Sequence, residues 1–557
     1  MNLFFTVIVL FLPLAAGYFI YGFFLKKFFH LDDNRKTPAH TFRDGRDFEP
    51  TNRFYLLGQH LSAIAAAGPI IGPILAGMWF GWGPAILWII LGGVFVGGVH
   101  DMSALIASIR HQGKSIAEVV KAHMPKRAFI LFLVFLWFSL MYIITAFTDI
   151  TVNTFVDPVN GSKVASSSMM YLGLALVMGI AVQRFKLNLK LATVIFTPLI
   201  LVCIYAGNWL PLKVPSILGM DQRQIWNMLL LVYCFIASVI PVWLLLQPRG
   251  YLGGFFLAGT VFVSFIGIAV GSIFGHLRVE YPVFVSWHNP SGLPLFPLLF
   301  ITIACGACSG FHALVASGTT SRQLDKETDS ALVGYGGMLL ESVVAIIALA
   351  TLMVLGVARV NELKDPNMIY ASGIATFLNS LGIDKAFALN FALLAFATFV
   401  YDTLDVATRL GRYIFEELAG LRNKYSQYIA SFITLLLPGV FLMQKIVDAS
   451  GNVIPAWKVF WTVFGASNQL LAGFVLFVVS LWLFRHKMKY LHILIATVFM
   501  LATSMFSLVL LVRPTVVNIL SGKFKIGPID ITAFILLGLS VFLIIEGVIV
   551  FVKKDKK

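Results

Sequence analysis

The chain has 557 residues, of which 59% are hydrophobic and 12% are charged, and its mean hydropathy is +0.88. Soluble domains carry about 25% charged residues, so this composition excludes a soluble globular protein and indicates one large polytopic membrane protein. The formal net charge is +15. Because the basic residues lie in short stretches between apolar runs, the charge is typical of membrane orientation, and no nucleic-acid partner is expected.

A helix needs about 20 apolar residues to cross the hydrocarbon core, and the sequence contains about fifteen runs of this kind. They occupy residues 3–25, 56–78, 84–108, 128–148, 166–183, 191–209, 226–246, 251–275, 297–319, 331–357, 386–408, 427–444, 456–484, 490–512 and 531–552. No positive charge precedes the first run, and Lys26 and Lys27 follow it, so it is expected to remain as an anchor.

The Lys and Arg residues between the runs predict the orientation. With the amino terminus outside, about 29 of the 41 basic residues fall on the inner side, a count in which Arg249 is a loop residue. The prediction is therefore a multi-pass protein of the cytoplasmic membrane with its carboxy terminus inside. The longest connection, 26–55, is too short for a soluble catalytic domain, and no enzyme activity or cofactor is expected.

Two of the runs contain residues that interrupt helices. Residues 67–73 read Ala-Gly-Pro-Ile-Ile-Gly-Pro, and residues 305–312 read Cys-Gly-Ala-Cys-Ser-Gly-Phe-His. Unpaired backbone groups at this depth are tolerated only where they line a cavity or are buried in protein. The glycine spacing also fits close helix packing, so packing and a broken helix both remain open for each segment.

The two segments run in opposite directions across the membrane, as an inverted repeat requires. Secondary transporters place substrate between two such discontinuous helices, whose free amide ends face anionic groups. The pattern predicts a transporter, with a substrate carboxylate held by backbone amides near residues 68–72 and 306–310. A channel would need a continuous polar stripe, and a sensor would need a soluble output domain.

Ionisable residues inside the runs are the candidates for ion coupling, because buried charges in membranes usually face a pathway. Asp405 and Arg409 lie four residues apart and are expected either to form a structural ion pair or to leave Asp405 free to carry a proton with Asp402. Thr403 and Thr408 offer hydroxyl groups to sodium as the alternative.

Three further candidates stand elsewhere in the runs. Glu341 has no evident local partner, and His60 and His312 flank the two interrupted segments. Histidines there are expected either to titrate near neutral pH or to act as packing donors. Convergence of His60, His312, Glu341 and Asp405 on a metal stays open, with no metal site predicted. Asp101 is expected to reach the inner surface near Arg110.

Several segments together resemble the carbon starvation protein A (CstA) family over residues 30–480. They are Gly58-Gln59-His60, Ala67-Gly68-Pro69-Ile70-Ile71-Gly72-Pro73, Ser309-Gly310-Phe311-His312-Ala313-Leu314-Val315, Ser317-Gly318-Thr319-Thr320, Gly334-Tyr335-Gly336-Gly337-Met338-Leu339 and Phe464-Gly465-Ala466-Ser467-Asn468-Gln469-Leu470-Leu471-Ala472. The resemblance implies a secondary transporter that imports peptides under carbon starvation or, as the alternative, pyruvate, in each case with protons.

These considerations lead to an all-α fold with LeuT-like inverted five-helix repeats, two broken helices and extra helices. The expected divisions are an anchor and loop at 1–53, a first repeat at 54–210, intervening helices at 211–295, an inverted repeat at 296–485 and accessory helices at 486–557. The expected substrate-binding residues are Gly68, Pro69, Gly72, Gly306, Ser309, Gly310, His312, Asn468 and Gln469. The expected proton-coupling residues are Asp405, Glu341, Asp402 and His60.

Overall fold

The computed structural model describes residues 1–44, 47–65, 67–216, 219–275, 277–421, 423–446, 454–522 and 527–552. Within these ranges the regular structure is helical, and β pairing is confined to isolated bridges such as Asn2 with Arg278. The predicted all-α class is confirmed.

The helices of the first half, in chain order, are α1 (Leu3–Ala16), η1 (Gly17–Tyr21), α2 (Gly22–Phe28), α3 (Pro38–Thr41), α4 (Arg53–Ile64), α5 (Gly68–Phe80), α6 (Trp82–Gly92), η2 (Gly93–Gly97), α7 (Gly98–Arg110), α8 (Ile116–His123), α9 (Lys126–Phe155), α10 (Gly161–Gln183), α11 (Leu189–Trp209), α12 (Gln222–Val239) and α13 (Leu246–Ile273). Those of the second half are α14 (Leu295–Thr302), α15 (Gly310–Gly318), η3 (Thr320–Arg322), η4 (Glu327–Asp329), η5 (Ala331–Gly336), α16 (Gly337–Met353), α17 (Val357–Leu363), α18 (Pro366–Asn379), α19 (Lys385–Ala419), α20 (Ser426–Met443), α21 (Ala456–Arg485), α22 (Leu491–Leu520) and α23 (Pro528–Val552).

Twelve helices of the described chain are long and apolar enough to cross a membrane, or 13 if the bent pair α4 and α5 counts as one span. The predicted count of about fifteen is therefore not confirmed. Two predicted runs account for the difference. The run at 226–246 lies mostly in α12, whose 18 residues begin with polar side chains, and the run at 297–319 is divided into helices of 8 and 9 residues.

The first predicted break is present, but it lies earlier in the chain than the prolines suggest. Helix α4 ends at Ile64, α5 begins at Gly68, and their axes are bent by 51°. Pro69 lies in the first turn of α5, where the missing N–H has no intrahelical partner to lose. Pro73 lies within the helix. The two prolines therefore sit in the helix that follows the break.

The second break lies between α14 and α15 and includes residues 303–309. The two breaks face each other. A Cβ on Gly72 would lie 2.5 Å from the carbonyl oxygen of Thr302, and one on Gly68 would lie 2.3 Å from Cys305 Sγ. The glycines therefore allow the two broken helices to touch, which combines the packing and the broken-helix interpretations of the sequence.

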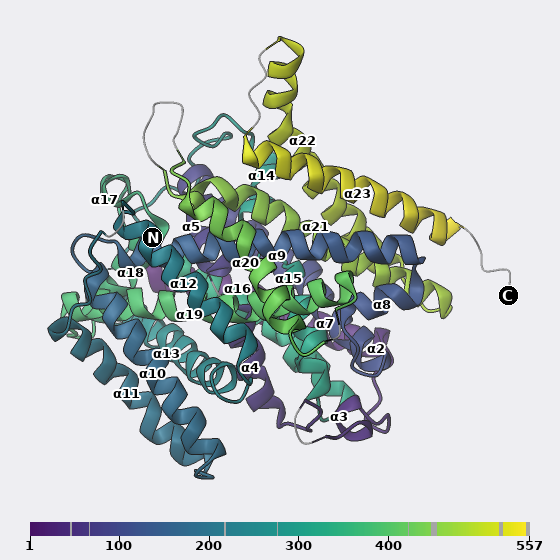
Figure 1. The fold of residues 1–557 in the computed structure, drawn as a ribbon. Coiled ribbons are helices and arrows are strands. Elements are labelled where there is room, and N and C mark those ends of the chain that lie inside the picture. Colours follow the sequence, from purple (N-terminus) through teal and green to yellow (C-terminus); the bar gives the residue numbers. More distant parts are fainter. Residues whose placement is uncertain are drawn as a thin grey trace.

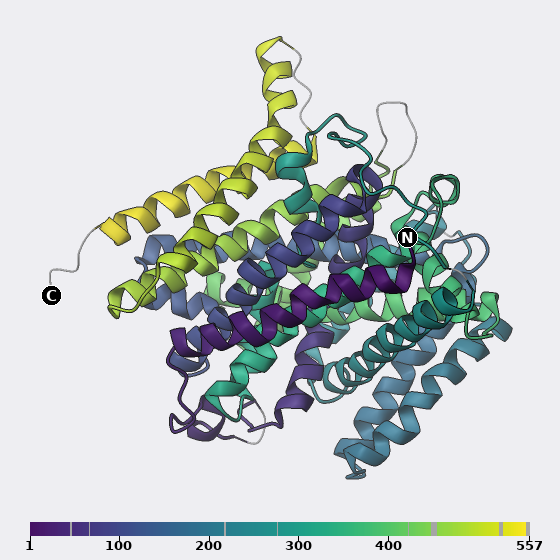
Figure 2. The same ribbon diagram turned by 180° about the vertical axis from the view of Figure 1, so that it is seen from behind.

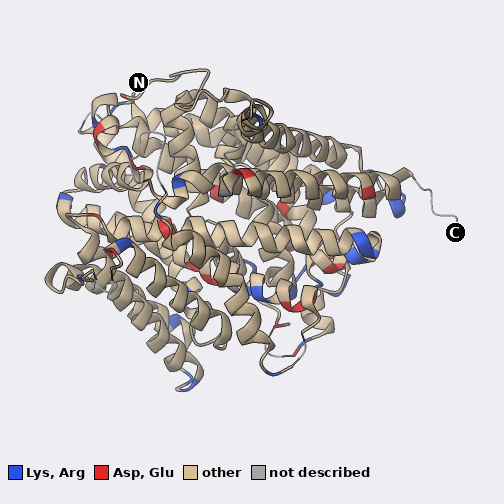
Figure 3. Ribbon diagram, turned by 45° about the horizontal axis from the view of Figure 1, so that its top comes forward, with Lys and Arg blue, Asp and Glu red and all other residues tan. Residues whose placement is uncertain are grey.

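Figure 1 shows the remaining helices around this pair, with the α10–α11 hairpin at one edge and α22 and α23 at the opposite edge. Figure 2 shows α1 lying along the outside of the bundle, where it contacts α13 and α16. Lys, Arg, Asp and Glu lie mainly in loops and at helix ends (Figure 3). The ionisable groups that lie inside the bundle are therefore exceptions to this distribution.

Candidate functional site

A chain of buried ionisable side chains joins three helices beside the second break. Asp101 of α7 accepts hydrogen bonds at both carboxylate oxygens, from His100 Nδ1 at 2.7 Å and from His312 Nδ1 of α15 at 2.7 Å. The other ring nitrogen of His312, Nε2, lies 3.1 Å from Glu341 Oε2 of α16. All four residues are 0% exposed. We call Asp101, His312 and Glu341 the acid–histidine chain.

The distance between His312 and Glu341 bears on the protonation of this chain. Because His312 directs Nδ1–H toward Asp101, its neutral ring presents a lone pair at Nε2. An ionised Glu341 would bring a second acceptor to 3.1 Å, and two acceptors at that distance repel each other. A neutral His312 beside an ionised Glu341 is therefore unfavourable, and the pair is more stable when one of its two members carries a proton, although the 3.1 Å contact does not have the geometry of a hydrogen bond.

The predicted surface position of Asp101 is wrong. Helix α7 continues for nine residues to Arg110, and Asp101 lies in its first turn, directly after the π-helical segment η2, where it contacts α15. Removing a carboxylate from water is costly unless it is paired and hydrogen-bonded, and the two histidines provide that pairing. Glu341, which has no evident partner nearby in the sequence, lies against His312.

His60 lies next to the acid–histidine chain. Its Nδ1 is 2.9 Å from the Thr320 hydroxyl, and its Cδ2 would be 3.1 Å from a Cβ at Gly337. Gly337 and Glu341 are four residues apart and so lie on one face of α16. His60 therefore packs against α16 one helical turn from Glu341.

Asn468 of α21 closes the amino end of α15. Its Oδ1 accepts a hydrogen bond from the backbone N–H of Phe311 at 2.9 Å, and its Nδ2 donates to the Ser309 hydroxyl at 3.0 Å. First-turn amides of a helix lack intrahelical partners, so an oxygen acceptor is favoured there. A Cβ on Gly310 would lie 2.5 Å from the Asn468 carbonyl oxygen, which shows how closely α21 approaches.

The structure thus brings several predicted substrate-binding residues together, namely Ser309, Gly310, His312 and Asn468, with Gly68, Pro69 and Gly72 across the break. Gly306 lies within the second break, where its carbonyl accepts from the Ser342 hydroxyl at 3.2 Å. Gln469 turns away and donates to the Phe300 carbonyl at 2.5 Å. Among the described residues, no group of three or more His, Cys, Asp or Glu is arranged to hold a metal ion.

A second buried cluster holds Asp402 and Asp405, and its cation is Arg249. Arg249 of α13 lies 3.1 Å from Asp402 Oδ1 and 2.5 Å from Asp405 Oδ2, and its side chain is 0% exposed. Tyr233 donates to Asp405 Oδ2 at 2.8 Å, and Ser62 of α4 donates to Asp402 Oδ2 at 2.5 Å.

The predicted pairing of Asp405 with Arg409 is wrong. Arg409 instead donates to the carbonyl oxygens of Ala237 and Ile240, each at 2.7 Å. Treating Arg249 as a loop residue is also wrong, because α13 begins at Leu246 and buries it. Asp149 was missed as well; it is paired with Arg223 at 2.5 Å.

Replacing Arg249 with Met is expected to lower the free energy of unfolding by about 3–5 kcal/mol, because two buried carboxylates would lose their cation. The triple variant Arg249→Met with Asp402→Asn and Asp405→Asn is expected to recover most of the loss. Thermal unfolding of the purified variants measures both effects. Equal stability of the single variant and the wild type would show that the carboxylates do not depend on Arg249.

The segment before α4 lies across the ends of the neighbouring helices. We call residues 29–44 and 47–52 the strap. Glu327, which is 0% exposed, binds Arg35 of the strap at 2.8 Å and Arg110 of α7 at 2.9 Å. His40 Nε2 is 2.8 Å from Asp325, and the Thr51 amide donates to the Gln323 carbonyl at 2.9 Å. The strap is thus fastened to the connection between α15 and η5.

Replacing Glu327 with Gln is expected to release the strap, because the shared carboxylate of Arg35 and Arg110 is removed. Trypsin should then cleave the strap several times faster in the detergent-solubilised protein. Glu49→Gln is the matched control, since among the described residues Glu49 forms its ion pair with the exposed Arg43, and such surface pairs contribute about 0–1 kcal/mol. Equal cleavage rates for both variants would contradict the assignment.

Two broken helices in contact, with a buried acid–histidine chain beside the break, define the class of polytopic secondary transporters. The family described as carbon starvation protein CstA matches residues 2–370 and 356–507. The chain belongs to this family.

Individual relatives agree with the family match. A peptide transporter CstA of Helicobacter pylori is 33% identical over 538 residues, covering 85% of this chain and 76% of the relative. A pyruvate/proton symporter BtsT of Escherichia coli is 31% identical over 559 residues, with 85% and 76% coverage. Among solved structures, a manganese transporter of Eremococcus coleocola is similar with a TM-score of 0.46 and 14% identity, covering 91% of this chain and 99% of that one.

Proposed function

We propose that this protein is a proton-coupled importer of peptides in the cytoplasmic membrane, used to scavenge nutrients when carbon is scarce. The observation that supports proton coupling is the buried contact of His312 Nε2 with Glu341 Oε2 at 3.1 Å, a pair that is more stable when one of its members carries a proton. Peptide as substrate is supported by the names of relatives such as the one from Helicobacter pylori. The function is transport and not catalysis.

The proton carrier in this proposal is Glu341 with His312 and Asp101. Asp405 of α19, the carrier favoured by the sequence, contacts Arg249 and Tyr233, so its charge is already compensated. Asp402 is bound in the same way, although its hydrogen bond from Ser62 also links it to α4, the first half of a broken helix. These two carboxylates of α19 therefore connect it to α13 through Arg249 and to α4 through Ser62.

The substrate carboxylate in this proposal binds at the amino end of α15. There the Phe311 amide is occupied by Asn468 Oδ1 at 2.9 Å, an oxygen acceptor that a carboxylate could replace. The positive end of the helix dipole and His312 both favour an anion at this place. Substrate binding would thus act directly on the residue that shares the proton.

The two inverted repeats in this proposal begin at α4 and α14. The packing supports a first repeat made of α4–α5, α6–α7, α9, α12 and α13. Its last helix, α13, contacts α4 and α19, and the last helix of the second repeat, α21, makes the corresponding contacts with α15 and α9. The hairpin α10–α11 is then the insertion, in place of the predicted intervening segment 211–295. The outside amino terminus and inside carboxy terminus inferred from loop charges complete the topology.

Uptake into proteoliposomes tests the proposal. Labelled dipeptide and labelled pyruvate are supplied separately, with a proton gradient or a sodium gradient imposed. We expect saturable accumulation of dipeptide driven by the proton gradient alone. Accumulation of pyruvate instead would favour the alternative that the Escherichia coli relative's name suggests. Uptake driven by sodium alone would contradict proton coupling. Thr403 and Thr408, whose hydroxyl groups could bind sodium, would then be the residues to replace.

A further inference from the structure

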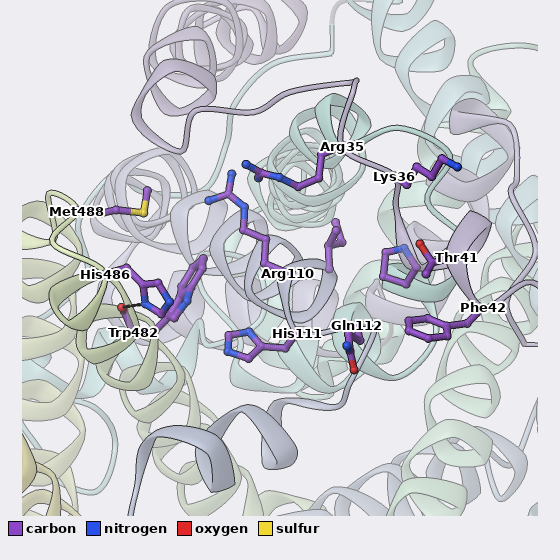
Figure 4. Close-up of a pocket in the computed structure, with 12 residues that line it drawn as sticks. Arg35, Lys36, Thr41, Phe42, Arg110, His111, Gln112, Trp482, His486 and Met488 are labelled. Carbon is purple, nitrogen blue, oxygen red and sulfur yellow. Dashed lines mark hydrogen bonds between the residues drawn. The ribbon is translucent and has the colours of Figure 1, made fainter. Parts of the chain in front are cut away.

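A pocket of about 490 Å³ lies between the strap and the ends of α7 and α21 (Figure 4). Its wall includes Arg35, Lys36, Arg110, His111, Trp482 and His486. The volume is in the range of about 300–1,000 Å³ that is typical of sites for small molecules. The transport proposal assigns no role to this pocket.

The lining of the pocket is cationic. Its basic residues are Arg35, Lys36 and Arg110, and no Asp or Glu is among the described residues that line it. Glu327 lies behind the wall and is shared by Arg35 and Arg110, so one carboxylate faces two guanidinium groups. Lys36 is exposed and forms no ion pair with another described residue. A surplus of positive charge therefore faces the space.

The arrangement of the donors favours a compact anion with several oxygens. In Figure 4 the guanidinium groups of Arg35 and Arg110 lie side by side, with Trp482 next to them. The Arg110 guanidinium carbon is 5.9 Å from the Trp482 ring centre, which holds the side chain in place. Arg110 uses Nε for Glu327 and Nη2 for the Phe29 carbonyl, and Arg35 uses Nη1 for Glu327. The remaining guanidinium N–H groups and the point charge of Lys36 are the donors that suit phosphate oxygens.

Two imidazoles lie at the rim of the pocket. His486 is held through Nδ1, which is 2.9 Å from the Trp482 carbonyl. His111 is held at both ring nitrogens, with Nδ1 2.6 Å from the Ala107 carbonyl and Nε2 2.9 Å from His123 Nε2. Burial lowers the pKa of His111. A bound anion would favour the protonated ring.

The position of the pocket connects it to the strap and to the membrane surface. Two apolar spans end at its rim, Trp82–Arg110 and Ala456–Arg485, so the opening lies at the level where a bilayer ends. Arg35 and Lys36 belong to the strap, whereas Arg110 and His486 belong to the helical bundle. An anion bound between them would hold the strap against α7 and α21.

We propose that this pocket binds a phosphate-bearing anion, either the headgroup of an acidic phospholipid or a soluble phosphate compound, and that the bound anion fixes the strap on the bundle. This site lies outside the acid–histidine chain and does not depend on which substrate is transported.

Thermal unfolding of the full-length protein in nanodiscs tests the proposal with two probes. Inorganic pyrophosphate is titrated into nanodiscs of phosphatidylcholine, and phosphatidylglycerol is added to a second set without pyrophosphate. We expect one probe to raise the unfolding midpoint saturably. Stabilisation by pyrophosphate identifies a soluble ligand, and stabilisation by phosphatidylglycerol identifies a lipid headgroup.

Lys36→Glu is expected to raise the half-saturating concentration of the effective probe by about tenfold or more, through loss of one charge-assisted contact and addition of a repulsive one. Lys326→Glu makes the same charge change at an exposed position on a neighbouring loop and should leave the half-saturating concentration unchanged. If Lys36→Glu folds poorly, Lys36→Gln should weaken binding in the same direction. No stabilisation by either probe, or an equal response of the Lys36 and Lys326 variants, would overturn the site.

Discussion

Replacing Glu341 with Gln is expected to abolish peptide accumulation driven by a proton gradient while substrate exchange continues. The amide has the shape of the acid but cannot release a proton, so His312 Nε2 keeps a partner at 3.1 Å without proton exchange. With one proton per substrate, a gradient of one pH unit supports about tenfold accumulation in the wild type. The variant should reach a ratio of about one under the same gradient.

Counterflow measurements separate a lost carrier from a lost fold. The Glu341→Gln protein should exchange internal for external labelled dipeptide, because exchange needs no net proton movement. Glu362→Gln is the matched control, since Glu362 is exposed and pairs with Arg359 on the surface. Accumulation by Glu341→Gln at the wild-type level would show that the proton is carried elsewhere.

Replacing Gly310 with Val is expected to reduce uptake to background while the protein remains in the membrane. A Cβ at this position would lie 2.5 Å from backbone atoms of Asn468 and Ala472, so α21 would have to move away from the amino end of α15. Overpacking of this kind costs about 1–3 kcal/mol. The movement would also withdraw Asn468 Oδ1 from the Phe311 amide.

Gly58→Val is the control, because a Cβ on Gly58 meets nothing within 4 Å. The corresponding clash at Gly68 involves the side chain of Cys305, so Gly68→Ala should impair uptake, and Cys305→Gly in the same protein should relieve it. Normal uptake by Gly310→Val would contradict both the close packing and the substrate site.

Features determined by local sequence could be predicted. The apolar runs, the two interrupted spans and the position of Glu341 and His312 within the apolar spans follow from hydropathy and from glycine and proline content. The position of the first break could not be fixed this way. Pro69 reads as an interruption in sequence, yet proline is well suited to the first turn of α5, so the break precedes it.

Partners from distant segments could not be predicted. Asp405 has Arg409 four residues away, which favours a local pair, but the tertiary packing places Arg249 of α13 against it at 2.5 Å. Asp101 lies near Arg110 in sequence, which favours a position at the surface, whereas α15 brings His312 to it at 2.7 Å. A periodic pattern gives the face of a helix and not the identity of the helix that packs on it.

Substrate-induced proton entry is the most direct measurement of the central claim. Wild-type protein is reconstituted in proteoliposomes that enclose a pH-sensitive dye, with the same buffer pH on both sides and potassium with valinomycin to compensate charge. Addition of an inward-directed dipeptide gradient is expected to acidify the interior with wild-type protein and to leave the signal unchanged with Glu341→Gln. Dipeptide entry without acidification in the wild type would contradict proton coupling through the acid–histidine chain.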